Sequence, residues 1–209
     1  MNLKQYFIPI KEKRIKDSKF NKEIEVVRFS GALRLDMGGL TQSGEVIERI
    51  WSSGFKNLLP RDFVPKKILV LGFGGGSVAK VISKKWNMAK ITGVEIDPAV
   101  VEIAREMFEV DKNENLLIIN DDAATYVSNL KKDFDLIIVD CYLGDKFPKS
   151  LESLDFYEKL LRTDGVVLVN RLFWGDYKKQ ALDLRDKLGM KFEIKSARTP
   201  SNYLIRVMK

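Results

Sequence analysis

From residue 65 onward, apolar positions follow two different spacings. Short continuous apolar runs, such as 68–71 (ILVL) and 134–140 (FDLIIVD), are typical of strands buried on both faces of a parallel sheet. Between such runs, apolar residues recur at helical spacing, as in 77–86 (SVAKVISKKW). Strands and helices are therefore expected to alternate. The expected strands are 68–71, 90–97, 116–120, 134–140, 166–173, 190–198 and 202–209, and the expected helices are 77–86, 98–109, 123–130, 151–165 and 175–189.

This alternation predicts an α/β fold. Helices between consecutive strands imply a doubly wound, mostly parallel sheet with right-handed crossovers. Only residues 199–201 separate the last two strands, so these two must form an antiparallel hairpin. A seven-stranded, mostly parallel sheet with a C-terminal antiparallel hairpin is similar to the Rossmann-like class I fold of methyltransferases that depend on S-adenosylmethionine (AdoMet).

The first 64 residues are expected to form a small extension before a main domain of residues 65–209. Two short runs, 24–29 and 32–36, meet near Ser30 and predict a β-hairpin. Prolines at positions 60 and 65 mark the entry to the main domain, because proline favours turns and loops over regular structure.

A helix is expected to follow this hairpin, over residues 45–59. Thr41 or Ser43 precedes the first apolar position and is expected to cap the helix. Trp51 lies on the apolar face of the helix, where packing in the protein core is the expected role for so large a side chain.

A glycine-rich turn joins the strand at 68–71 to the next helix. Gly72, Gly74 and Gly76 fit the pattern G-x-G-x-G, in which glycine permits a tight turn and a close approach of the backbone to a ligand. The N terminus of the following helix offers free N–H groups to that ligand. Glu95 ends the next strand, where an acidic residue commonly binds ribose hydroxyls. Together these residues predict a nucleotide-containing ligand.

Composition excludes several chemistries. The chain has no histidine, so His-based general-base catalysis, Ser-His-Asp systems and ordinary zinc sites are not expected, and no metal site is predicted. A single cysteine, Cys141, cannot form an intrachain disulfide. No apolar run is long enough to cross a membrane, and the first residues do not resemble a secretion signal, so a cytoplasmic protein is expected.

The net charge of +7 raises the question of nucleic-acid binding. The basic residues are spread along the chain without interleaved aromatic residues, which favours an ordinary solvated surface. No N/D-P-P-Y motif follows the fourth strand, so a nucleic-acid methyltransferase is the least favoured function.

Several segments resemble the spermidine synthase-like branch of the methyltransferase fold. The segments LVLGFGGGSVAKVI, ITGVEIDPAVVEIAREMF, NDDAATYV, FDLIIVDCY and SLDFYEKLLRTDGVVLVN match this group in order and spacing. The stretch LDMGGLTQSGEVIERIW resembles the segment before the core in the same group. The resemblance covers roughly residues 32–172, and it implies AdoMet or its decarboxylated form as the cofactor. Dimers are known in the group, so a homodimer is also an expectation.

The resemblance implies a role for individual residues of this chain. The three turn glycines, 72, 74 and 76, would line the methionine part and the ribose. Glu95 would bind the ribose hydroxyls, with Ile96 against the adenine. Asp122 would accept from the adenine amine, with Ala123 beside it. Asp140 would lie next to the sulfonium carbon as the catalytic residue, and Gln42 would lie near the cofactor or the acceptor.

The sequence departs from spermidine synthases after the fourth strand. Those enzymes carry D-x-x-D there, and the second carboxylate helps to hold the diamine. In this chain the stretch is Asp140-Cys141-Tyr142-Leu143, so that carboxylate is missing. Tyr142 and Asp145 are the candidate acceptor-binding residues.

Two functions follow from these residues. The favoured one is an AdoMet-dependent methyltransferase that acts on a small molecule, with an amine as one candidate acceptor. The alternative is an aminopropyltransferase that uses decarboxylated AdoMet and putrescine. The methionine carboxylate distinguishes the two functions, because a methyltransferase must accommodate it and an aminopropyltransferase should discriminate against it.

Overall fold

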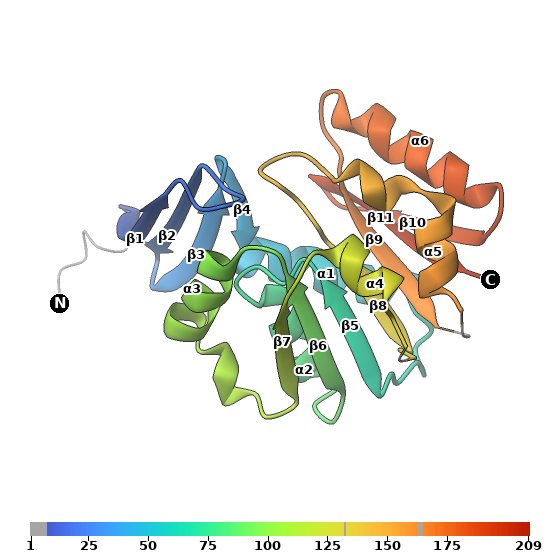
Figure 1. The fold of residues 1–209 in the computed structure, drawn as a ribbon, viewed down its shortest axis with the longest axis horizontal. Helices are drawn as coiled ribbons and strands as arrows, with labels where there is room; N and C mark the ends of the chain where they lie inside the picture. Colours follow the sequence, from blue (N-terminus) through green and yellow to red (C-terminus); the bar gives the residue numbers. More distant parts are fainter. Residues whose placement is uncertain (1–7, 132, 163–164) are drawn as a thin grey trace.

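The computed structural model describes residues 8–131, 133–162 and 165–209, and its strands form two sheets (Figure 1). The strands of the larger sheet are β5 (Lys67–Leu71), β6 (Lys90–Glu95), β7 (Leu116–Asn120), β8 (Leu136–Val139), β9 (Val166–Leu172), β10 (Glu193–Arg198) and β11 (Asn202–Met208). Their order in space is β10-β11-β9-β8-β5-β6-β7. The strands β5 to β9 are parallel, and β11 pairs antiparallel with both β9 and β10.

The predicted fold class is confirmed by this sheet. It is seven-stranded and mostly parallel, and its C-terminal strands form the expected antiparallel hairpin. The chain builds outward from β5 in both directions, first through β6 and β7 and then through β8 and β9. The strand order therefore reverses between β5 and β8. In sheets of this kind, ligands bind in the crevice at the carboxyl ends of the strands beside that reversal.

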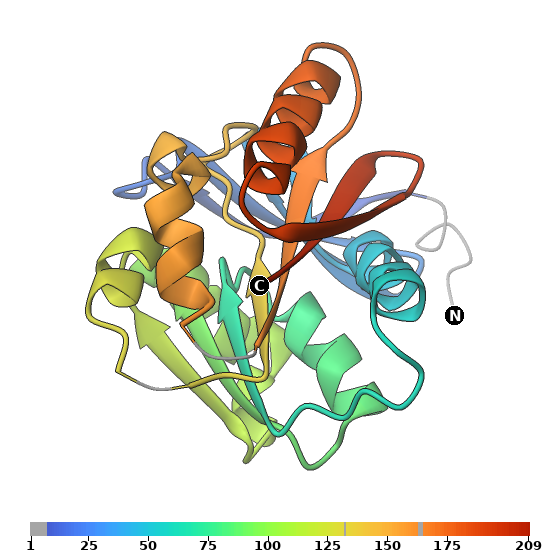
Figure 2. The same ribbon diagram turned by 90° about the vertical axis from the view of Figure 1, so that its right-hand side faces the viewer.

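Helices cover both faces of the larger sheet (Figure 2). On one face lie α1 (Glu45–Leu58), α2 (Ser77–Lys85) and α3 (Pro98–Phe108); on the other lie α4 (Ala123–Ser128), α5 (Leu154–Leu160) and α6 (Tyr177–Gly189). The central strand shows why the apolar run is continuous. Ile68 and Val70 pack with α1 and α2, while Leu69 and Leu71 pack into the opposite layer, because successive side chains of a strand point to opposite faces.

The N-terminal sheet is larger than the predicted hairpin. The two expected strands are present as β2 (Glu23–Phe29) and β3 (Ala32–Met37), but β1 (Ile10–Lys16) and β4 (Leu40–Ser43) flank them in a four-stranded antiparallel sheet. The segment IKEKRIK of β1 is mostly charged and lies at the edge of the sheet, so it lacks the apolar alternation of a half-buried strand. The strand β4 has only four residues, too few for a periodic pattern.

Two local predictions were wrong. The residue that caps α1 is Gly44, not Thr41 or Ser43, because Ser43 belongs to β4 and its hydroxyl accepts a hydrogen bond from elsewhere in the fold. The described part of the expected helix 151–165 is instead a short 3-10 helix, η3 (Lys149–Glu152), followed by α5; residues 163–164 of the expected range lie outside the described residues. Ser153 separates them as the N-cap of α5, where its hydroxyl accepts from the N–H of Phe156. A second 3-10 helix, η2 (Val110–Lys112), follows α3.

The N-terminal sheet packs against α3. Apolar side chains of β2 and β3 form a common cluster with Val100 and Ile103. Beside that cluster, the fully buried carboxylate of Asp97 caps α3 and accepts from Ser18 Oγ at 2.5 Å and from Asn21 Nδ2 at 2.7 Å. We propose a boundary near residue 64, because the two sheets share no strand; residues 1–7 of the extension lie outside the described part of the chain. No helix in the described ranges has the length and apolar character that a membrane span needs.

Candidate functional site

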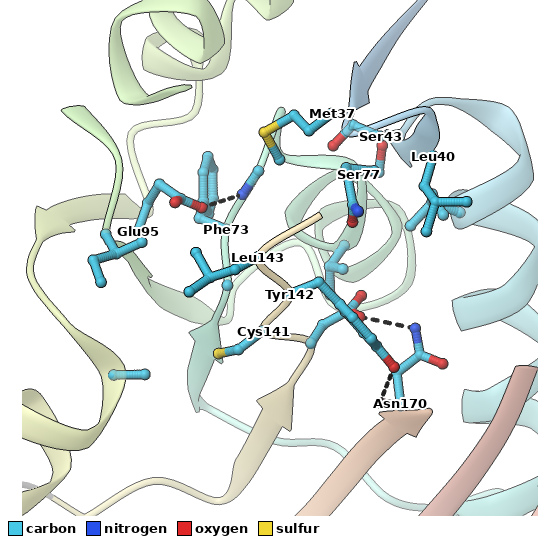
Figure 3. A pocket seen from close by; sticks show the side chains of 18 of the residues that line it. Met37, Leu40, Ser43, Phe73, Ser77, Glu95, Cys141, Tyr142, Leu143 and Asn170 are labelled. Atoms are coloured by element: carbon cyan, nitrogen blue, oxygen red, sulfur yellow. Dashed lines mark hydrogen bonds between the residues drawn. The ribbon is translucent and has the colours of Figure 1, made fainter. Parts of the chain in front are cut away.

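A cavity of about 430 Å³ lies at the carboxyl ends of the parallel strands. Its lining comes from the ends of β5 to β9, from the loop after β8, and from β4 and α1 of the N-terminal extension. Figure 3 shows that side chains from these distant segments meet around one space. The cavity therefore occupies the crevice where the strand order reverses, which is the expected ligand position in this type of sheet.

The glycine turn brings the backbone close to the cavity. Gly72 has a φ of 82° and Gly74 a φ of 55°, both in the left-handed region that glycine adopts without strain. A Cβ atom at position 72 would lie 2.3 Å from the carbonyl oxygen of Asp140, so only glycine fits between β5 and the chain that leaves β8. Both glycines line the cavity, whereas Gly76 lies outside the lining and caps α2.

Glu95 lies at the tip of β6, almost fully buried, and lines the cavity. Its Oε2 accepts from the N–H of Gly74 at 2.9 Å (Figure 3). Its Oε1 accepts from the N–H of Asp97 at 3.1 Å. Burial raises the pKa of the Glu95 carboxyl above its ordinary value of 4.5, although these backbone donors favour the charged form. The carboxylate is thus fixed in position and keeps lone pairs that can accept from a ligand.

The raised pKa of Glu95 predicts a pH effect on stability. The folded protein holds the Glu95 proton more tightly than the unfolded chain, so the contribution of Glu95 to stability is present below pH 4.5 and is lost as the pH rises through the raised pKa. Glutamine does not titrate. We therefore expect the stability of Glu95→Gln, relative to wild type, to increase between about pH 4 and about pH 8. Urea unfolding of both proteins at both pH values measures this, and a difference that does not change with pH would contradict it.

Two adjacent aspartates lie at the end of β7. Asp122 caps α4, with Oδ1 accepting from the N–H of Thr125 at 2.8 Å, and it also lines the cavity. Asp121 lines the cavity too, and its Oδ1 accepts from the N–H of Asp122. The capping role and the ligand-binding role considered for Asp122 are therefore compatible. Ile96 and Ala123 line the same part of the cavity.

Asp140 follows β8 and occupies the middle of the cavity wall. Its Oδ2 accepts from Trp51 Nε1 and its Oδ1 accepts from Asn170 Nδ2, each at 2.8 Å. Burial raises the pKa of the Asp140 carboxyl, and these two hydrogen bonds oppose the rise. Trp51 is fully buried, as predicted, but it also orients this carboxylate.

Hydrogen bonds between buried side-chain amides fix the residue that donates to Asp140. Asn202 Nδ2 donates to Asn170 Oδ1 at 2.9 Å, so the Asn170 amide is fixed with its nitrogen toward Asp140. The Tyr142 hydroxyl donates to the carbonyl of Asn170 and accepts from the N–H of Leu172. Cys141 is buried, and this burial raises the pKa of its thiol, which makes it a packed residue and not a nucleophile.

The N-terminal extension closes one side of the cavity. Gln42 lines the cavity, and its Nε2 donates to the carbonyl of Gly144 at 3.0 Å, joining β4 to the loop after β8. Ser43 Oγ accepts from the N–H of Gly75 at 2.7 Å, and Ser77 Oγ accepts from the N–H of Gly44 at 2.7 Å. The extension is thereby fixed to the glycine turn.

Asp145, a predicted acceptor-binding residue, does not line the cavity. Its carboxylate accepts from the Tyr177 hydroxyl, and this hydrogen bond lowers the pKa of Asp145. The predicted residues that line the cavity are Gln42, Gly72, Gly74, Glu95, Ile96, Asp122, Ala123, Asp140 and Tyr142.

The sequence did not predict the contacts of Trp51, Ser43 and Asn202 at the site, and it placed Asn170 at the carboxyl end of its strand, where ligands bind, without assigning it a role. Asn170 had a usable signal, because it is a polar residue inside the otherwise apolar run of β9 at the carboxyl end of the strand. The other three had none, since their contacts join segments far apart in the sequence.

All the described charged side chains that line the cavity are acidic. Its charged lining residues are Glu95, Asp121, Asp122 and Asp140, and among the described residues neither lysine nor arginine lines it. This contrasts with the net charge of +7 for the whole chain. In the described ranges, no group of three or more potential ligands lies close enough together to hold a metal ion. The acidic lining therefore suits a positively charged ligand.

A comparison with models of known protein families identifies the family of this chain. The model for the spermine/spermidine synthase domain matches residues 58–180, more than half of the chain. The chain belongs to the spermine/spermidine synthase family. The resemblance read from the sequence is therefore confirmed, and the matched range includes the glycine turn, Glu95, Asp122 and Asp140.

A curated relative within this family is the polyamine aminopropyltransferase of Vibrio vulnificus (strain CMCP6). It is 28% identical over 151 residues, which cover 69% of this chain and 50% of the relative. The chain thus spans about half the length of the curated relatives it matches.

Solved structures show the same fold. A probable spermidine synthase from Corynebacterium glutamicum ATCC 13032 superposes with a TM-score of 0.78 at 19% identity, over 96% of this chain and 81% of that one. Human methyltransferase-like protein 13, in complex with SAH, superposes with a TM-score of 0.63 at 20% identity, over 78% of this chain and 81% of that one. The spermine/spermidine synthase family member described here therefore shares its fold with both groups.

Proposed function

We propose that this chain binds decarboxylated AdoMet and transfers its aminopropyl group to an amine. The observation that carries the proposal is the charge of the cavity, which is lined by four carboxylates and, among the described residues, by no basic side chain. AdoMet has a carboxylate that would need a cationic or N–H partner. Decarboxylated AdoMet carries positive charge only, on the sulfonium and the amine, and it matches this lining.

The comparisons support aminopropyl transfer better than methyl transfer. The sequence favoured a methyltransferase and kept aminopropyl transfer as the alternative. The matching family model describes a spermine/spermidine synthase domain, and the curated relatives in Vibrio vulnificus and Neisseria meningitidis are named polyamine aminopropyltransferases. The methyltransferase in the structural comparison supports the fold alone.

The donor half of the cavity lies at β5, β6 and β7. Gly72 and Gly74 line the cavity without a side chain, so the donor can lie against the backbone of the turn. Glu95, already fixed by the N–H of Gly74, accepts from the ribose hydroxyls with its remaining lone pairs. The free oxygen of Asp122 accepts from the adenine amine, with Ile96 and Ala123 along the ring.

Asp140 is the proposed catalytic residue. Bound decarboxylated AdoMet supplies a carbon activated by the sulfonium. Asp140 orients the attacking amine and takes its proton while the new C–N bond forms and the C–S bond breaks, with the bonding pair left on sulfur. Burial raises the pKa of Asp140, which makes the carboxylate a better proton acceptor. Hydrogen bonds from Trp51 and Asn170 hold the carboxylate in one orientation.

Calorimetric titration with decarboxylated AdoMet and with AdoMet tests the proposal. We expect decarboxylated AdoMet to bind at least about tenfold more tightly, since only AdoMet brings a carboxylate into an acidic cavity. Asp122→Asn is the matched control, because it faces the adenosine part that both molecules share and should weaken both equally. Tighter binding of AdoMet would return the assignment to methyl transfer, and binding of neither would overturn the donor site.

A further inference from the structure

We infer that the preferred acceptor is a primary monoamine with an apolar tail, and not a diamine. The inference rests on the proposed aminopropyl transfer and concerns the part of the cavity beyond Asp140. Of the four lining carboxylates, Glu95, Asp121 and Asp122 lie at β6 and β7, on the donor side. Asp140 is then the only carboxylate that the described residues offer to an acceptor.

The acceptor half is mostly apolar. It is built by β4 and α1 on one side and by the loop after β8 and the end of β9 on the other. Its apolar lining residues are Leu40, Val46, Ile47, Leu143, Leu151, Leu172 and Trp174. Leu143 occupies the position at which the D-x-x-D pattern would place a second carboxylate, and it lines the cavity. An alkyl or aryl tail matches such a surface.

Several neutral polar side chains of this half are hydrogen-bonded to the protein. Asn170 and Asn202 bind each other, and the Tyr142 hydroxyl binds the backbone of β9. Gln42 donates to the carbonyl of Gly144, and the Thr41 hydroxyl donates to Asp36. These bonds leave Gln42 Oε1 and the lone pairs of the Thr41 hydroxyl as neutral acceptors, so a second ammonium finds no charged partner among the described residues of this half.

The nearest other acid in sequence does not replace the missing carboxylate. Asp145 lies outside the lining and accepts from the Tyr177 hydroxyl. An ammonium in the acceptor half would lose its hydration without gaining an ionic partner, which is unfavourable, whereas a methyl group in the same place is buried favourably. The cavity thus selects one amine, at Asp140, attached to an apolar chain.

The test compares pentylamine with putrescine, since the two have the same number of non-hydrogen atoms and differ only in a methyl group replacing one ammonium. Initial rates with decarboxylated AdoMet give kcat/KM for each amine. In parallel, calorimetry gives the affinity of each amine for the protein saturated with methylthioadenosine, the product left by the donor. We expect both kcat/KM and the affinity to be about tenfold or more higher for pentylamine than for putrescine.

Leu143→Asp tests the reason for the preference. A carboxylate at this position is expected to raise the ratio of kcat/KM for putrescine to kcat/KM for pentylamine by about tenfold or more. Leu143→Asn has a side chain of the same size as Asp without the charge, and it should leave this ratio unchanged. Met88→Asp is the control for net charge. Met88 is 82% exposed in the turn before β6, at the opposite end of the sheet from the cavity, and this variant should keep the wild-type preference.

The outcomes separate the inference from the proposed function. If putrescine is the better acceptor in wild type, the monoamine preference is overturned while aminopropyl transfer stands. If Leu143→Asp leaves the ratio of kcat/KM for the two amines unchanged, the missing carboxylate does not cause the preference for the monoamine. If decarboxylated AdoMet is not bound at all, the proposed function fails, and the affinities of the two amines for the free protein still decide which one the cavity accepts.

Discussion

The Asp140→Asn variant is expected to lose about two to four orders of magnitude in kcat for aminopropyl transfer. Its affinity for the donor should change by less than about tenfold, because the proposed contacts to adenosine come from β5, β6 and β7. Single-turnover rates and calorimetry with decarboxylated AdoMet measure the two quantities separately.

The local hydrogen bonds explain why so small a change has so large an effect. The carboxylate of Asp140 accepts from two donors, Trp51 Nε1 and Asn170 Nδ2, one on each oxygen. An amide has one acceptor oxygen, so its NH2 group must face one of these two donors and lose that hydrogen bond. The variant therefore loses the proton acceptor and part of its fixed orientation together.

Asp135→Asn is the matched control for this substitution. Asp135 precedes the same strand at its other end, is exposed, and accepts from the N–H groups of Lys66 and Lys67 through a single oxygen. An amide oxygen can accept the same two bonds, so we expect the rate to stay within about threefold of wild type. A normal rate in Asp140→Asn would exclude Asp140 as the proton acceptor.

The sequence predicted the larger sheet well because its evidence is local. The strands β5, β7, β8 and β9 are continuous apolar runs over most of their length, and the residues at the ends of the parallel strands, among them Glu95 and Asp140, must meet at one edge of the sheet. The glycine turn could be assigned for the same reason, since its function depends on the conformation of three nearby residues.

The parts that the sequence did not predict depend on contacts between distant segments. Whether Trp51 would reach Asp140 depends on where α1 packs, and nothing near Trp51 specifies that. Ser43 has the residue type and position of a helix cap, but Gly75 provides a competing donor that only the folded chain brings near. Asp145 lies close to Asp140 in sequence, yet the turn after Leu143 directs it to Tyr177.

The second large effect is expected from Gly72→Ala. A Cβ at position 72 would lie 2.3 Å from the carbonyl oxygen and 2.7 Å from the carbonyl carbon of Asp140, and both atoms belong to backbone that cannot rotate away. The φ of 82° is also unfavourable for alanine. We expect the free energy of unfolding to fall by about 3 to 5 kcal/mol. Donor binding should weaken as well, because any shift that relieves the contact moves Asp140.

Gly31→Ala separates the two causes of this loss. Gly31 has the same φ of 82°, but a Cβ there would meet no atom within 4 Å. Its substitution should therefore cost only the conformational part, about 1 to 2 kcal/mol. Urea unfolding of the two variants gives the cost of the contact as their difference. Equal losses would mean that β5 and the chain leaving β8 can separate freely, and then the close approach of Gly72 to Asp140 would not hold the catalytic carboxylate in place.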